Sequence, residues 1–232
     1  MSTARRIAVL QPGYLPWLGF FDQMVRSDLF IYYDDVQFDV HGWRNRNRIK
    51  GPGGLVWLTV PVRHSGRNKP SINEIEIDTR YPWIRKHLGT IAQFYRRAPH
   101  FEPYFTELSQ VLSQPWTLLV ELDLALIEML RRWLGIGTET HRASSLGIGG
   151  ERSDRLLDIC ERLGANTYLS GDAAKDYLDV DLFHEHGISV EWQAYEHPVY
   201  SQLHGDFAPY VSVLDLILNV GPESAGFFCK RI

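Results

Sequence analysis

The sequence is poor in the groups on which disulfide-linked, zinc-binding and membrane proteins depend. It contains 2 cysteines, and Cys160 and Cys229 lie far apart, outside any paired metal-ligand or redox spacing. A disulfide scaffold or zinc ribbon is therefore unsupported, and both thiols are expected to be reduced core groups. No uncharged segment approaches the length of a membrane-spanning helix, and the first residues lack the apolar region of a signal peptide. We expect a cytoplasmic protein that makes no membrane contact.

Familiar catalytic motifs and an excess of positive charge are also missing. The chain has no Gly-x-Ser-x-Gly elbow, no dinucleotide-binding glycine fingerprint, no His-Glu-x-x-His and no kinase signature. Its formal net charge is -4, so it has no global basic field for a nucleic-acid backbone. A nucleic-acid partner is therefore disfavoured, with contact to transfer RNA left open, and any anion site must be local.

The composition is that of an ordinary globular protein. Apolar residues make up 44% and charged residues 22% of the chain, which argues against long disordered segments. A length of 232 residues is enough to bury a substantial core. We expect one α/β domain over residues 1–232, with a mid-chain helical segment.

The first feature of interest is a strand followed by a tight loop and a helix. The apolar run 7–10 predicts a buried strand that Gln11, Pro12 and Gly13 end, and Pro16 marks a helix start. In an open α/β sheet, ligands bind at such a carboxyl strand end. The functional interpretation is that Gln11 and Tyr14 face a ligand beside Trp17. The alternative is that Gly13 and Pro16 only make the turn, with the aromatic side chains in the core.

A second strand is predicted over residues 29–33, and it ends in acids. Asp34, Asp35 and Gln37 follow it, on the same sheet edge as the first loop if the two strands are parallel. A carboxylate there can bind an amine, a ribose or a metal ion. The alternative is that one or both aspartates cap or turn the backbone.

Residues 43–50 form the most concentrated cationic segment of the chain. Planar guanidinium groups can grip phosphate bidentately, and alternate residues of a strand share one face. The glycine-rich turn at 51–54 is not a Walker loop, because no Gly-Lys-Ser/Thr follows it. We expect an anion site, with a solvated hairpin face as the alternative. The candidate residues are Arg44, Asn45, Arg46, Arg48 and Lys50.

The next segments are predicted from apolar periodicity. Residues 55–62 form a strand that Pro61 ends, and alternation over 72–78 predicts a half-exposed strand. The basic loop between them is expected to be an exposed loop or a lid over an anionic ligand. From Tyr81 to Leu134 the spacing changes to helical and predicts three helices, whose apolar stripes we assign to the core.

The C-terminal third repeats the pattern of strand, small-residue loop and helix. Residues 138–150 are a polar turn, and a helix precedes the strand that ends at Ser170 and Gly171. These two residues allow close approach of a phosphate, and Lys175 could add charge. Strand ends with glycine are common in α/β proteins, so a structural role is the alternative.

A last strand is predicted over 188–192, and a polar loop follows it. His197, Tyr200 and Gln202 suit substrate recognition, with His197 a candidate general base, although a single histidine is more often structural. The final helix covers 211–218.

These segments together resemble the WbqC-like family, named for a protein of bacterial O-antigen gene clusters. They span nearly the full chain in the expected order. The resemblance implies attachment of glycine or another small amino acid to an amino group on a nucleotide-linked sugar. The matching segments are Gln11-Pro12-x-Tyr14-Leu15-Pro16-Trp17-x-Gly19-Phe20-Phe21, Tyr33-Asp34-Asp35-Val36-Gln37-Phe38, Arg44-Asn45-Arg46-x-Arg48-Ile49-Lys50, Trp57-Leu58-Thr59-Val60-Pro61-Val62, Thr167-Tyr168-Leu169-Ser170-Gly171 and His197-Pro198-x-Tyr200-x-Gln202.

A weaker resemblance is architectural. The layout is similar to the open, mostly parallel sheet of nucleotidylyltransferases and pantothenate synthetases, of the HUP or Rossmann-like type, which activate a carboxylate with ATP. The chain departs from them where their paired histidines would stand, because Gln11 and Tyr14 occupy the first loop. Positioning and electrostatic stabilisation by cations and backbone amides could still support such chemistry.

The resulting hypothesis is an amide-forming acyl or aminoacyl transferase that takes an amine, an acyl donor and a nucleotide or nucleotide-sugar, with ATP and Mg²⁺ as candidate cofactors. The alternative is a non-catalytic nucleotide- or carrier-binding module that acts with a partner enzyme. Catalytic roles fall to Gln11, Tyr14, Asp34, Asp35 and His197. Substrate or phosphate binding falls to Trp17, Gln37, Arg44, Asn45, Arg46, Arg48, Lys50, Ser170, Gly171, Lys175, Tyr200 and Gln202.

Overall fold

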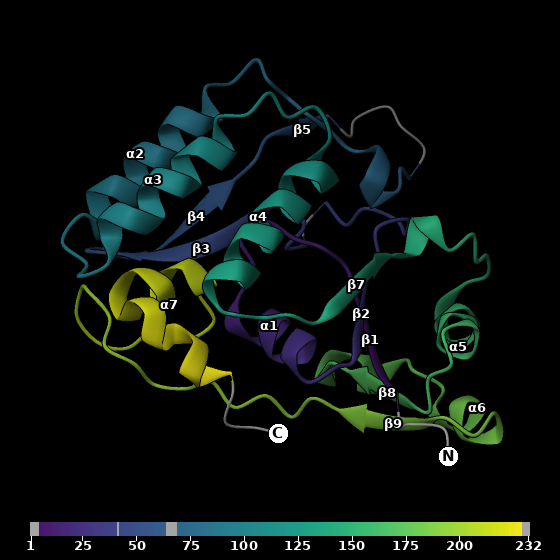
Figure 1. Cartoon of the computed structure of the whole chain (residues 1–232). Coiled ribbons are helices and arrows are strands. Elements are labelled where there is room, and N and C mark those ends of the chain that lie inside the picture. Colours follow the sequence, from purple (N-terminus) through teal and green to yellow (C-terminus); the bar gives the residue numbers. More distant parts are fainter. Residues whose placement is uncertain (1–4, 41, 64–68, 229–232) are drawn as a thin grey trace.

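A five-stranded parallel sheet forms the centre of the computed structural model (Figure 1), which describes residues 5–40, 42–63 and 69–228. The strand order is β7-β2-β1-β8-β9, and each neighbouring pair is parallel. The predicted open parallel α/β sheet is confirmed. The strands are β1 (Arg6–Leu10), β2 (Leu29–Tyr32), β7 (Glu139–Arg142), β8 (Thr167–Ser170) and β9 (Ser189–Trp192).

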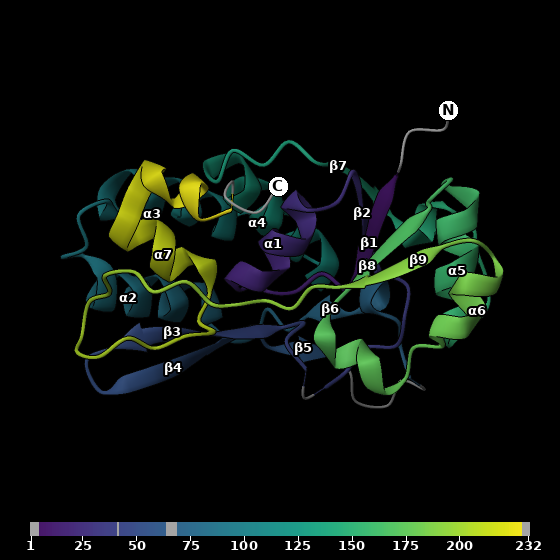
Figure 2. The same cartoon turned by 90° about the horizontal axis from the view of Figure 1, so that it is seen from below.

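Helices cover both faces of this sheet. Successive side chains of a strand point to opposite faces, so each strand packs against both helical layers. In β1, Ile7 and Val9 pack with the layer of α5 (Arg152–Arg162) and α6 (Val180–Glu185). Ala8 packs on the opposite side with α1 (Leu18–Val25). Figure 2 shows α5 and α6 on one side of the sheet and α1, α4 and α7 on the other. A strand buried on both faces explains the continuous apolar run in β1.

The chain order of the strands creates a switch point beside β1. From β1 the chain moves outward to β2 and β7 and then returns to form β8 on the other side of β1. Crossover connections therefore leave β1 and β8 in opposite directions, which opens a crevice beyond their carboxyl ends. The predicted placement of Asp34 at the same edge as the first loop is confirmed, since β2 is parallel to β1.

The edge strand β7 contradicts the prediction of a polar turn over 138–150. Its residues pair in parallel with β2, and Tyr32 lies opposite Arg142. All four residues of β7 are at least partly exposed and none is aliphatic, so hydrophobic periodicity gives no strand signal. Polar edge strands of this kind discourage pairing with other chains.

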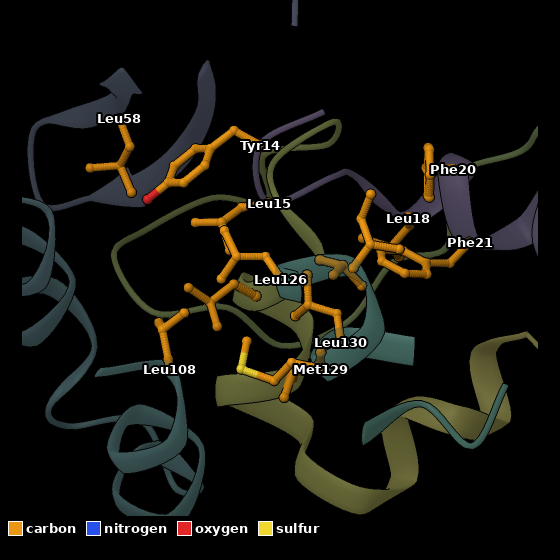
Figure 3. Close-up of a cluster of buried hydrophobic side chains, with 14 of the residues drawn as sticks. Tyr14, Leu15, Leu18, Phe20, Phe21, Leu58, Leu108, Leu126, Met129 and Leu130 are labelled. Carbon is orange, nitrogen blue, oxygen red and sulfur yellow. The ribbon is translucent and has the colours of Figure 1, made fainter. Parts of the chain in front are cut away.

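The mid-chain helices are confirmed, and they pack with a hairpin to form the second half of the core. They are α2 (Trp83–Tyr95), α3 (Phe101–Leu112) and α4 (Leu119–Trp133), joined by α7 (Val213–Val220) and by the antiparallel hairpin of β3 (Arg46–Gly51) and β4 (Gly54–Thr59). Figure 3 shows Tyr14 and Leu15 of the β1–α1 loop among Leu58 of the hairpin and Leu126 of α4. The loop after β1 is therefore part of the core.

The predicted half-exposed strand over 72–78 is wrong for most of its length. Ser71 and Glu74 form a capping box that starts the 3-10 helix η1 (Ile72–Glu74), and local side-chain bonds of this kind compete with strand pairing. Only β6 (Glu76–Ile77) remains extended, paired with β5 (Val62–Arg63). Residues 64–68 of the expected loop or lid lie outside the described residues, as does Cys229.

Further short helices complete the fold, and they are η2 (Ala143–Ser145), η3 (Asp172–Asp176) and η4 (Gly221–Phe227). None of the helices in the described part of the chain combines the length and the apolar character of a membrane-spanning segment.

Asp34 links the carboxyl ends of β2 and β7. Its fully buried carboxylate accepts hydrogen bonds from Arg142 Nε at 2.7 Å, Ser144 N at 3.0 Å and Ser144 Oγ at 2.7 Å. Removing one partner of a buried ion pair leaves the other charge and donors uncompensated. The carboxylate therefore adds a side-chain link to the backbone pairing that holds the polar edge strand.

We expect Asp34→Ala to lower the free energy of unfolding by about 3 kcal/mol, measured by urea denaturation. The matched control is Asp158→Ala at an exposed position of α5, which should change stability by less than about 0.5 kcal/mol. Equal stability of the two variants would contradict a structural role for Asp34.

Candidate functional site

A cavity of about 350 Å³ lies at the carboxyl end of β1, within the size range of small-molecule sites. It is enclosed by the β1–α1 loop, the start of the β3–β4 hairpin and the segment before α7. The lining residues are Leu10, Gln11, Gly13, Pro16, Trp17, Phe20, Trp43, Arg44, Asn47, Arg48 and Tyr210.

Close backbone contact brings the hairpin segment to the end of the sheet. The Tyr14 N–H donates to the carbonyl oxygen of Arg44 at 2.9 Å. A Cβ atom on Gly13 would lie 2.7 Å from the carbonyl oxygen of Trp43, a distance that real Cβ contacts do not reach. Gly13 is therefore required for the approach that places Trp43 and Arg44 beside β1.

Aromatic side chains form much of the cavity wall. The Trp17 ring packs edge-on against Tyr195 at 5.0 Å and lies 5.5 Å from Tyr210. It also covers Gly19, where a Cβ would lie 2.2 Å from the indole. Trp17 is the N-cap residue of α1, so the start of this helix also positions the indole that forms one wall of the cavity.

Arg44 supplies one positive charge to the cavity. Its Nη1 donates to the carbonyl oxygens of Gln11 at 2.8 Å and Pro12 at 3.2 Å. Its Nε is buried and has no hydrogen-bond partner in the described part of the chain. Burial lowers the pKa of Arg44 to about 10, while Asp123 and Asp39 act in the opposite direction. The guanidinium therefore remains charged at neutral pH.

Arg48 supplies the second charge, and it is held by stacking. Its guanidinium lies 5.2 Å from the Trp43 ring centre and 5.6 Å from that of Trp57, and cation–π contact of this kind orients the group. Arg48 Nη2 donates to the Tyr210 carbonyl oxygen at 3.2 Å, whereas Nε is a buried donor without a partner among the described residues. Two arginines that line one cavity are suited to binding an anion.

The Tyr210 wall is held in a strained conformation. Its φ is 58°, in the left-handed region that bulky residues rarely adopt. The Arg48 bond to its carbonyl oxygen and the bond from Ser212 N to the Arg48 carbonyl oxygen at 2.9 Å hold this segment. Strain of this kind is frequent at ligand sites.

Sequence reasoning found some of these lining residues and missed others. Of the candidates, the cavity contains Gln11, Trp17, Arg44 and Arg48. Asn47 was missed. Its Nδ2 donates to the Leu15 carbonyl oxygen at 2.8 Å, and this bond helps to hold Leu15 of the β1–α1 loop at its φ of 44°. The position of Asn47 between two cationic residues of a strand was the available signal. Phe20, Trp43 and Tyr210 were also missed, and Tyr210 has no local motif that would reveal it.

Tyr14 does not line the cavity, contrary to its predicted ligand-facing position. Its side chain is fully buried, and its hydroxyl lies 2.9 Å from Nδ1 of His87 in α2. Burial raises the pKa of Tyr14 and lowers that of His87 to about 4. The side chain thus anchors the loop in the core (Figure 3), as the alternative interpretation had it.

The aspartate pair is occupied by arginines. Asp34 binds Arg142, and Asp35 Oδ2 binds Arg155 Nη2 at 2.6 Å. No group of three or more His, Cys, Asp or Glu side chains that could hold a metal ion occurs in the part of the chain that the structure describes. Each aspartate is already paired with an arginine. The pair therefore does not fit the expected binding of Mg²⁺ or an amine, and no step is assigned through Mg²⁺.

Lys50, Tyr200 and Gln202 belong to a buried polar network. Lys50 Nζ donates to Gln202 Oε1 at 3.1 Å and to the carbonyl oxygens of Gly205 at 3.3 Å and Asp206 at 2.5 Å. Tyr200 donates to Asp215 Oδ1 at 2.9 Å, and burial raises the pKa of Asp215. These groups attach residues 200–206 to the hairpin, away from the cavity lining.

His197 lies directly behind the cavity wall. Its ring centre is 5.3 Å from that of Tyr210, and rings of Tyr195, Tyr200 and Phe207 also surround it. Burial lowers the pKa of His197. Its Nδ1 lies 2.9 Å from the Pro198 carbonyl oxygen, and its buried Nε2 has no described partner.

The remaining candidates lie outside the cavity lining. Arg46 stacks on Trp57 at 4.6 Å, and Asn45 Nδ2 donates to the Val60 carbonyl oxygen at 2.8 Å. Lys175 pairs with Asp172 at 2.5 Å. Three further candidates also lie outside the cavity lining. Gln37 forms an isolated β-bridge with Ser71, and the Ser170 carbonyl oxygen accepts a hydrogen bond from Gln193 N. Gly171 lies against the Gln23 side chain.

Comparison with known proteins finds sequence matches over almost the whole chain. A family model described as "WbqC-like protein family" matches residues 11–226. The chain is also similar to "Uncharacterized protein Rv1507c" of Mycobacterium tuberculosis, with 36% identity over 231 residues, 98% of this chain and 100% of that protein.

We expect the burial of His87 to make stability depend on pH, because burial lowers the pKa of this imidazole. The pKa of His87 is about 4 in the folded state and about 6.5 when unfolded, so the unfolded chain binds more protons between these values. Stability is therefore full above the unfolded pKa and falls as pH decreases toward 4. From pH 7 to 5 His87 should remove about 2 kcal/mol from the free energy of unfolding.

The measurement is urea denaturation across that pH range. His87→Gln should lack this part of the pH slope, whereas His186→Gln, at an exposed position beside Glu161, should retain it. Parallel slopes for wild type and His87→Gln would contradict the assignment.

Proposed function

This chain belongs to the WbqC-like protein family, and on that premise we propose that it is an amide-forming acyl or aminoacyl transferase whose phosphorylated substrate binds in the cavity at the end of β1. The substrate class is a nucleotide or nucleotide-linked amino sugar. The observation that carries the proposal is the pair Arg44 and Arg48, which both line one aromatic-walled cavity.

The two parts of such a substrate suit the two kinds of wall. Arg44 and Arg48 offer charge-assisted hydrogen bonds to phosphate oxygens. Trp17 and Trp43 offer flat apolar surfaces for a ring. The location supports the same proposal, because the cavity opens at the carboxyl end of the strand beside the switch point.

His197 is our proposed base for removing a proton from the attacking ammonium group. With Nδ1–H donating to the Pro198 carbonyl oxygen, the neutral ring carries its lone pair on Nε2. Depression of its pKa by burial favours this neutral form. Tyr210 separates the ring from the cavity, so the base acts only when that side chain moves aside.

A non-catalytic binding module is the second candidate. The observation that favours it is the composition of the cavity lining, which among the described residues includes no carboxylate, imidazole, thiol or primary amine. A site of this composition can bind a nucleotide and present it to a partner enzyme without performing the reaction.

The direct test is incubation with ATP, glycine and a panel of nucleotide-linked amino sugars, followed by mass spectrometry for an amide product and for AMP or ADP. Amide formation supports the transferase. Tight nucleotide binding by calorimetry without product from any acceptor supports the binding module and contradicts the transferase.

We expect Arg48→Ala to weaken binding of the nucleotide-linked sugar by about 10- to 100-fold, because a charge-assisted hydrogen bond contributes about 1.5–3 kcal/mol. Isothermal titration calorimetry measures the change. Arg85→Ala, an exposed cation of α2, is the matched control and should bind normally. Equal affinity of both variants would exclude Arg48 from the site.

The variant His197→Phe distinguishes a role of His197 as the base from a role in substrate binding. Phe preserves the packing against Tyr195 and Tyr210, so binding should remain within about twofold, while turnover should fall by about 100-fold or more if His197 removes the proton. Single-turnover kinetics measures the second quantity. Turnover that matches wild type would remove His197 from the mechanism.

A further inference from the structure

Two tryptophans lie side by side on the surface of the β3–β4 hairpin and its leading segment. Trp43 and Trp57 are 42% and 44% exposed, and their ring centres are 5.0 Å apart. The chain has 7 tryptophans, and the others are buried or half-buried. Exposed apolar residues are ordinary where they are scattered singly, whereas adjacent ones mark ligand or interaction sites.

The pairing of the hairpin strands explains why these groups face outward. In β3, Arg46 and Arg48 are half-buried and alternate with the buried residues Asn47 and Ile49. Arg48 lies opposite Trp57 of β4, and cross-strand partners share one face of a sheet. The two arginines and Trp57 therefore lie on the face that points away from the core. Figure 2 shows α2 and α7 on one side of the hairpin and β4 at the outer margin of the molecule.

Guanidinium groups extend this exposed aromatic surface. Arg46 lies 4.6 Å from the ring centre of Trp57, and Arg48 lies 5.6 Å from the same centre and 5.2 Å from that of Trp43. Arg46 Nε also donates to the Gly42 carbonyl oxygen at 3.2 Å. Aromatic rings interleaved with cations are the arrangement on which nucleobases stack while their phosphates are bound nearby. We call these four residues, Trp43, Arg46, Arg48 and Trp57, the stacking surface.

The stacking surface is continuous with the cavity at the end of β1. Trp43 and Arg48 belong to both, because they also line the cavity. A phosphate group held by Arg48 therefore lies between the inside of the cavity and the exposed ring of Trp57. A molecule with phosphates at its centre and a ring system at each end can occupy both places at once.

The size of the cavity suits one end of such an elongated molecule. Its volume is about 350 Å³, near the lower end of the range of about 300–1,000 Å³ that small-molecule sites span. A nucleotide-linked sugar carries its base on one side of the phosphates and its sugar on the other. The proposed base catalyst, His197, lies behind the Tyr210 wall of the cavity, so the end with the amino group must enter. The nucleobase then lies outside.

We propose that Trp57, together with Trp43 and Arg46, forms an outer subsite that stacks the base of a nucleoside diphosphate, while Arg48 binds the phosphates at the mouth of the cavity. This inference rests on the nucleotide-binding part of the proposed function and deepens it, because it assigns the two ends of the substrate to two places. Stacking requires only the π face of a base, so the subsite accepts purines and pyrimidines. No bond forms or breaks in this step.

Adenosine and uridine diphosphates are the probes, and inorganic pyrophosphate is the probe that lacks a base. Isothermal titration calorimetry on the full chain measures the affinity for each. Trp57→Leu keeps an apolar side chain at this exposed position and removes the indole. It should weaken binding of both nucleotides by about 5- to 100-fold. Pyrophosphate affinity should remain within about twofold, because Trp43 still orients Arg48 by cation–π contact.

Two further variants sharpen the comparison. Trp57→Phe keeps an aromatic ring and should retain most of the nucleotide affinity. Tyr81→Ala is the matched control, because Tyr81 is an aromatic residue that is 58% exposed and lies outside the cavity lining. It should bind all three probes as wild type does. Sedimentation velocity of wild type and Trp57→Leu tests whether the stacking surface instead joins two copies of the chain.

Nucleotide affinity that is equal in wild type and Trp57→Leu would overturn the inference and leave the proposed function intact. Dissociation of a wild-type dimer by Trp57→Leu, with nucleotide affinity unchanged, would likewise overturn it and assign the surface to a second copy. An equal loss of nucleotide and pyrophosphate affinity would contradict a subsite for the base.

A loss confined to the nucleotides, in a protein that forms no amide, would support the inference and contradict the transferase. Absence of nucleotide binding by wild type would contradict both. The two proposals can therefore fail separately.

Discussion

The site depends on the close approach of two backbone segments, the β1–α1 loop and the start of the hairpin. Gly13 lies against the Trp43 carbonyl group, and the next residue bonds to the Arg44 carbonyl oxygen. Through this contact the parallel sheet gains a cationic and aromatic wall that its own strand ends do not provide. The buried Tyr14–His87 pair secures the same loop from the core side. One loop thus connects sheet, hairpin and α2.

The sequence revealed the elements whose signal is local. Apolar runs identified β1 and β2, helical spacing identified α2 to α4, and turn residues placed Asp34 at the correct sheet edge. It failed where local signals compete or are absent. The capping box at Ser71 converted an alternating segment into a 3-10 turn, and β7 is recognisable only from its pairing with Tyr32 and its neighbours.

The difference between local and long-range signals also explains which residues of the candidate site could be predicted. Gln11, Trp17, Arg44 and Arg48 lie in motifs near strand ends, and all line the cavity. Many other polar candidates instead bind partners elsewhere in the fold, because a buried polar group needs a partner. Which partner it finds depends on distant segments, as when Asp35 meets Arg155. Sequence motifs therefore located polar groups near the correct edge but did not distinguish those facing the cavity from those that stabilise the fold.

The cavity wall is assembled from segments far apart in the chain, which has a consequence for folding. Arg48 bonds to Tyr210, 162 residues later, so the wall exists only after the segment before α7 has docked. Contacts at this sequence separation require a large loop-closure entropy and form slowly. Local opening of that segment would abolish the site while leaving the parallel sheet intact. A bound ligand would shift the opening equilibrium, and amide hydrogen exchange around Tyr210 would then respond to occupancy more than exchange in β1.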